Sequence, residues 1–132
     1  MTDLPELYFR IRDNGAAVFR INTENRERRI EMDQIAVVNT NRGDYKAQGD
    51  NTLSAAEEAA INDWMQTRLA VLAARDVDDI HRAIDHLNLT AQWAQAKASD
   101  AQLDQITDDL LMAMHDLRSV LVRKKADRAA RG

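Results

Sequence analysis

The stretch that decides the fold reads GDNTLSAAEE, residues 49–58, because it joins the last internal glycine to the start of a long uninterrupted tract. From Asp50 to Arg131 the chain contains neither Gly nor Pro, whereas the first 49 residues hold three glycines and the single proline. Turns between strands use these residues, and helix interiors exclude them. The sequence therefore predicts an α+β protein, with an N-terminal sheet in residues 1–53 and a helical tract in residues 54–132.

The predicted sheet is an antiparallel β-meander of four or five short strands. Residues 7–11 and 17–21 alternate apolar and polar side chains, which is the period of a half-buried strand. Further strands are expected near residues 28–32, at 35–39 and at 45–48. Such a sheet has one apolar face, and the helical tract is expected to cover it.

The first turn of the meander lies at residues 13–15, Asp-Asn-Gly. A two-residue Asn-Gly turn would place Phe9 opposite Arg20 and mix apolar and charged side chains on one face. A three-residue loop with a left-handed glycine instead pairs Phe9 with Phe19. We therefore predict the longer loop, which leaves arginine side chains together on the outer face.

The helical tract begins with a capping box at residues 54–57, SAAE, in which the Ser and Glu side chains bond each other's backbone N–H groups. The apolar stripe that follows changes phase near residues 75–77, where Asp76 can cap a second helix. We predict a break there, and three helices in all; one continuous helix is the alternative.

The last helix is expected to begin at Ser99 or Asp100, after a short link. Apolar residues spaced alternately three and four apart run through residues 77–98 and 103–120, as in the seam of a coiled coil. A short link makes two such helices antiparallel neighbours, so the sequence predicts a helical hairpin.

Two apolar features exceed what one seam requires. The second predicted helix has an additional apolar stripe, and residues 110–114 of the last helix are apolar around the whole circumference. A helix that is apolar all round is surrounded on all sides. The core of a monomer could cover these features, but a second copy of the chain covers them more easily, so we expect a homodimer. The predicted interface residues are Leu89, Trp93, Ala96, Leu111, Met112 and Met114.

Catalytic and metal-binding patterns are weak. The absence of cysteine excludes disulfides, thiolate catalysis and Cys-ligated zinc. His81 lies at helical spacing from Asp78 and Asp85, but helical phase points His115 away from them, so we interpret the histidines as solvated or capping. The chain has no Gly-rich phosphate loop. We expect a non-enzymatic protein without catalytic residues, cofactor or metal ion.

The net charge is −4, which argues against a general nucleic-acid or membrane binder. A local patch is the main alternative, because an arginine-bearing sheet face and a basic C-terminal tail can bind nucleic acid. Its residues are Arg10, Arg12, Arg20, Arg29, Arg123, Lys124, Lys125 and Arg128.

The apolar runs fall well short of the roughly 20 residues of a membrane span, and the N-terminus does not resemble a signal peptide. We therefore expect a small cytoplasmic protein. Its expected function is that of a homodimeric adaptor or regulatory module that presents its surfaces to a partner protein.

Overall fold

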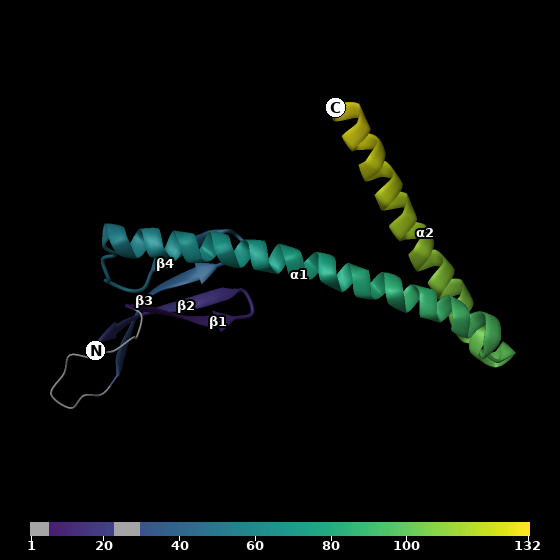
Figure 1. The fold of residues 1–132 in the computed structure, drawn as a ribbon, viewed down its shortest axis with the longest axis horizontal. Helices are drawn as coiled ribbons and strands as arrows, with labels where there is room; N and C mark the ends of the chain where they lie inside the picture. Colours follow the sequence, from purple (N-terminus) through teal and green to yellow (C-terminus); the bar gives the residue numbers. More distant parts are fainter. Residues whose placement is uncertain (1–5, 23–29) are drawn as a thin grey trace. The chain divides into compact units, whose positions relative to one another are not determined.

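The computed structural model describes residues 6–22 and 30–132 and shows a four-stranded antiparallel meander followed by two long helices (Figure 1). The predicted α+β order is confirmed, with two helices instead of three. The chain divides into two compact units, one ending at Asp79 and the other beginning at Ile80. The elements are β1 (Leu7–Arg12), β2 (Gly15–Asn22), β3 (Glu31–Asn39), β4 (Asp44–Ala47), α1 (Ala55–Ala96) and α2 (Asp100–Arg131).

The core of the first unit lies between the sheet and the first half of α1, which runs along one face of the sheet (Figure 1). The strands follow one another in the order β1-β2-β3-β4, so β2 and β3 are central. The apolar stripe predicted for the start of the helical tract is confirmed, because Ile61 and Met65 are buried against the strands. The buried cluster consists of Val18, Ile35, Ala36, Val38, Ile61 and Met65.

The β1–β2 hairpin turns at residues 13–14, with Arg12 opposite Gly15. The predicted three-residue loop is therefore wrong. Phe9 pairs with Val18 rather than with Phe19, and both side chains of that pair belong to the core that α1 covers. The true register puts Phe19 on the opposite face, which we call the outer face of the sheet.

Phe19 is almost completely buried on this outer face, with an exposed fraction of 8%. The Arg10 guanidinium lies 4.5 Å from the centroid of its ring, and the Tyr8 ring lies 6.3 Å away. A cation over an aromatic face is attracted by the quadrupole of the ring. Apolar side chains thus occupy both faces of β2, so their alternation does not indicate which face is the core.

The single strand β3 replaces the two strands predicted near residues 28–32 and at 35–39; residues 28–29 lie outside the described part of the chain. Its pairing with β2 shifts by one position, which leaves Ile35 as the extra residue of a β-bulge. Consecutive residues Ile35 and Ala36 are both fully buried. The bulge interrupts the alternation of the strand, and the sequence therefore suggested two strands.

Helix α1 continues without interruption through residues 75–77, so the predicted break is wrong. Nothing in this segment stops a helix, because it lacks Gly and Pro. An aspartate such as Asp76 inside a helix lowers helix stability by only about 0.5 kcal/mol relative to alanine. The change of phase reflects a change of surroundings: Ile61 and Met65 are buried against the sheet, whereas Ile80 is exposed.

Capping boxes begin both helices. The Ser54 hydroxyl accepts a hydrogen bond from the Glu57 N–H at 3.1 Å, and the Ser54 N–H donates to Glu57 Oε1 at 3.0 Å. Ser99 and Gln102 make the same reciprocal pair before α2, at 3.2 and 3.0 Å. The predicted box at Ser54 and the predicted start of the last helix are both confirmed.

Candidate functional site

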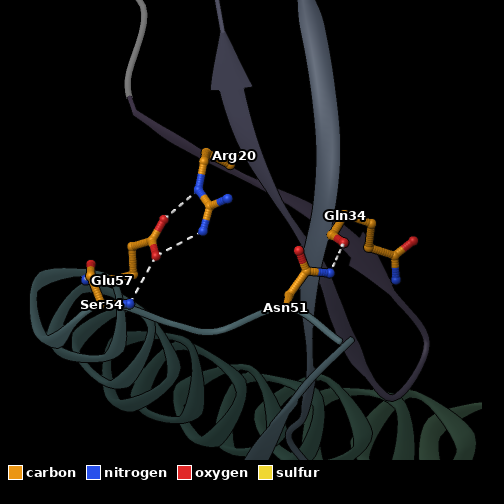
Figure 2. Close-up of polar contacts among 5 residues, drawn as sticks. All are labelled: Arg20, Gln34, Asn51, Ser54 and Glu57. Carbon is orange, nitrogen blue, oxygen red and sulfur yellow. Dashed lines mark hydrogen bonds and ion pairs between the residues drawn. The ribbon is translucent and has the colours of Figure 1, made fainter. Parts of the chain in front are cut away.

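A charged pair joins the sheet to the first turn of α1 (Figure 2). Arg20 of β2 donates to both carboxylate oxygens of Glu57, at 2.7 Å from Nε and 3.0 Å from Nη2. The hydrogen bond from Arg20, followed by the backbone N–H of Ser54, lowers the pKa of Glu57 from 4.5 to about 2. The strong hydrogen bonds of the Glu57 carboxylate thus come from Arg20 and Ser54 of the same chain, which indicates a structural role for the pair.

We expect Glu57→Gln to lower the free energy of unfolding at pH 6 by about 1 kcal/mol, because the Arg20 side chain is 42% exposed and water screens the pair. The pKa of Glu57 is depressed in the folded state, so this stabilisation is present above pH 4.5 and is lost as the pH falls toward about 2. Urea unfolding at a series of pH values measures the difference between wild type and variant.

Glu58→Gln is the matched control, because it removes the same charge from the adjacent residue. Its carboxylate is exposed and, within residues 6–22 and 30–132, contacts the Tyr45 hydroxyl at 3.5 Å. The control should remain close to wild type throughout the series. Equal losses for the two variants, or a Glu57→Gln difference that persists unchanged to pH 2, would contradict the structural role of the pair.

The residues of the nucleic-acid hypothesis do not form one surface in the first unit. Arg10 and Arg12 lie on the outer face, whereas Arg20 lies on the face that α1 covers and binds Glu57. The predicted common arginine face is therefore wrong, because the observed register places Arg20 opposite Leu7, on the side that α1 covers; Arg29 lies outside the described residues. The remaining members are exposed in the last turns of α2: Arg123, Lys124, Lys125 and Arg128.

The second unit leaves most of the predicted helical seam exposed. Its side chains are half-buried only near the link, at Ala94, Ala98, Leu103, Ile106 and Leu110. Farther from the link the large apolar side chains of the seam have exposed fractions of 42–61%, at Ile80, Ile84, Leu87, Leu117 and Val120. The two stripes therefore do not cover each other along their length in a single chain.

The predicted interface residues are also accessible, with one exception. Trp93 is half-buried beside a shallow hollow on α1 that Leu89 and Ala96 also line. The others that have large side chains are at least 50% exposed: Leu89, Leu111, Met112 and Met114. Neither helix, over its described residues, contains a segment that is long and apolar enough to cross a bilayer.

The histidines show no sign of a metal centre. His81 is exposed, and the ring of His115 lies 3.5 Å from the carboxylate of its neighbour Asp116. Among the described residues, no group of three histidine or carboxylate side chains is placed to hold a metal ion.

Comparisons of the chain with protein-family models, with curated proteins and with solved structures found no match. Function is therefore inferred from the chemistry of the described surfaces. Most of the exposed large apolar side chains among the described residues belong to the second unit.

Proposed function

We propose that this chain is a small, cytosolic, non-enzymatic protein-interaction module that acts as a homodimer, held together by the apolar surface of its second unit. One observation carries the proposal: the seam side chains from Ile80 to Leu87 and from Leu117 to Val120 are about half exposed in the single chain. Monomers rarely expose contiguous apolar patches of more than a few hundred Å², roughly 300–600 Å².

The pattern of the exposed side chains favours a second copy as the occupant. Seam positions run through residues 80–94 and 103–120, and none of them carries a charge. At about 1.5 Å per residue, these segments present roughly 20 and 25 Å of apolar helix. A partner with the same three-four spacing packs its side chains between them, and a second copy has this spacing by identity.

The two apolar stripes of α1 lie on different sides of the helix. The five exposed seam residues form the face that the second copy covers. Leu89 and Trp93 lie on the additional stripe, away from this seam, and are not counted in the seam contact. In the dimer, the seams of the two hairpins close into a four-helix arrangement.

Light scattering after gel filtration tests the proposal. We expect the wild-type chain at tens of micromolar to show twice the chain mass of 14.9 kDa. Ile84→Glu and Leu117→Glu should each shift the protein to the monomer mass, because a buried unpaired carboxylate in the interface is costly. Gln105→Glu is the matched control, since it adds the same charge at an exposed polar position of α2.

Circular dichroism of the same samples shows whether the charged variants remain helical. A wild-type chain that is monomeric at tens of micromolar would overturn the homodimer. A Gln105→Glu variant that dissociates as readily as Ile84→Glu would show that added charge, rather than the seam, controls assembly.

A further inference from the structure

The strand β1 forms one edge of the sheet, and within residues 6–22 and 30–132 no other strand pairs with its outer side. β1 is the first strand of the described sheet and pairs only with β2. The Ile21 N–H donates to the Glu6 carbonyl at 2.9 Å, so the even-numbered residues of β1 direct their backbone groups toward β2. Because these directions alternate in an antiparallel pair, the N–H and C=O groups of Leu7, Phe9 and Ile11 point outward from the sheet.

An apolar hollow of about 400 Å³ lies between this edge and the first turns of α1. Leu7 and Phe9 line its strand side together with Glu6, and Ala56 and Ala60, which are one helical turn apart, line its helix side together with Ser54 and Glu57. The Phe9 ring is held by a parallel stack on Trp64, with centroids 4.7 Å apart and planes at 4°. The hollow therefore has a fixed aromatic wall and a helix wall whose small side chains leave space.

We propose that the edge of β1 binds an extended segment of a partner protein as an additional antiparallel strand, whose alternate apolar side chains enter this hollow. The same residues that direct their backbone groups outward, Leu7 and Phe9, also line the hollow. In a strand hydrogen-bonded to them, the side chains opposite Leu7 and Phe9 lie on the same side of the sheet as the hollow. Main-chain hydrogen bonds then supply affinity, and the hollow selects the side chain.

Charge on the outer face specifies the remaining side chains of the partner. Those side chains lie beside Tyr8, Arg10 and Arg12, which are exposed. Among the described residues of this face, the only carboxylate on the other strands is Asp44, and it lies 3.3 Å from the Arg42 guanidinium. Acidic side chains opposite the two arginines are therefore favoured, and the partner segment alternates apolar and acidic residues.

The probe is the peptide Ac-EVEVTV-NH2, titrated into the full chain labelled with ¹⁵N. In the antiparallel register its glutamates lie opposite Arg12 and Arg10, and its valines lie opposite Ile11, Phe9 and Leu7. We expect the amide signals of these last three residues to shift and their hydrogen exchange to slow on binding.

Two altered peptides separate the contribution of the main-chain hydrogen bonds from that of the charged side chains. The same peptide with N-methylated valines lacks the donors for the outward carbonyls of β1 and should not bind. The peptide Ac-KVKVTV-NH2 should bind at least about threefold more weakly, because each attraction between glutamate and arginine becomes a repulsion between like charges.

Two protein variants test the hollow. Ala60→Leu fills it and should weaken binding of Ac-EVEVTV-NH2 about tenfold. Ala59→Leu is the matched control, an exposed alanine of α1 outside the hollow, and should bind as the wild type does. The monomer variant Ile84→Glu should keep the same peptide affinity, so that failure of the homodimer and failure of this site are distinguishable.

Several outcomes would overturn the proposal. N-methylated and unmodified peptides that bind equally would show that no strand is added. Slow exchange of the Leu7, Phe9 and Ile11 amides in the free protein would show that a second copy or another part of the chain already occupies the edge. An oligothymidylate that shifts Tyr8 and Arg10 while the peptide leaves the spectrum unchanged would assign the face to nucleic acid.

Discussion

Gly15→Ala is expected to lower the free energy of unfolding by about 3 kcal/mol. A Cβ at this position would lie 1.9 Å from the Val38 carbonyl oxygen and 2.7 Å from its carbon. These atoms belong to the backbone of β3, which cannot retreat without breaking the ladder with β2. The φ angle of +154° adds strain for any L side chain. Urea unfolding, followed by Trp64 fluorescence in a Trp93→Phe background, measures the loss.

Gly43→Ala is the control, because it makes the same chemical change at a glycine with room for the methyl group. Gly43 has a φ of +76°, and among the described residues no packing neighbour lies within 4 Å of the added methyl group. Only the cost of the left-handed conformation therefore applies, about 1 kcal/mol. Equal losses at the two positions would show that conformational strain alone, and not the approach of β3, requires glycine at position 15.

The second large effect is expected for Ile61→Ala, with a loss of about 3 kcal/mol. The Ile61 side chain is completely buried between α1 and the strands, in contact with the cluster that includes Val18 and Ile35. Truncation of the isoleucine side chain leaves a cavity between β3 and α1, which these two elements cannot fill by moving together. The same fluorescence assay applies, since Trp64 lies in the same part of α1.

Ile30→Ala is the matched control, because this isoleucine is 59% exposed. Its loss should be within about 0.5 kcal/mol. If Ile61→Ala behaved like Ile30→Ala, the packing of α1 on the sheet would contribute little to stability, and the core would have to be placed elsewhere.

Local signals in the sequence predicted the helical tract and its starts. The box between Ser54 and Glu57 needs only four adjacent residues, and the lack of Gly and Pro is a property of composition. The stripe that contains Ile61 and Met65 could be assigned to a buried face because its helical spacing is also a local property of the sequence. These features depend on neighbours along the chain, so a single sequence contains them.

The parts that were predicted wrongly depend on distant contacts. The observed register places Phe19 beneath Arg10 on the outer face and Arg20 on the helix side, where it binds Glu57, which is 37 positions away. The phase change of α1 marks where the sheet ends, rather than where the helix ends.

The hollow beside β1 was not anticipated for a related reason. Its two walls come from segments about 50 residues apart, and alanines such as Ala56 and Ala60 carry no signal of binding in a helix. The predicted register already placed Phe9 on the face that the helical tract covers, but only the observed hydrogen-bond pattern shows that the outward backbone groups and the apolar wall belong to the same residues. The exposed apolar residues of α1 and α2, in contrast, were visible in the sequence as a surplus of apolar side chains.

The bulge at Ile35 has a consequence for how this sheet can vary. The extra residue separates two stretches of regular pairing between β2 and β3. A shift of β3 along β2 by two residues would have to move the bulge as well. The bulge therefore fixes the alignment of the two strands. Deletion of Ile35 would give an unbroken ladder in which the residues before it keep their partners, with Met32 on the outer side and Asp33 on the helix side, so that only the buried isoleucine would be lost.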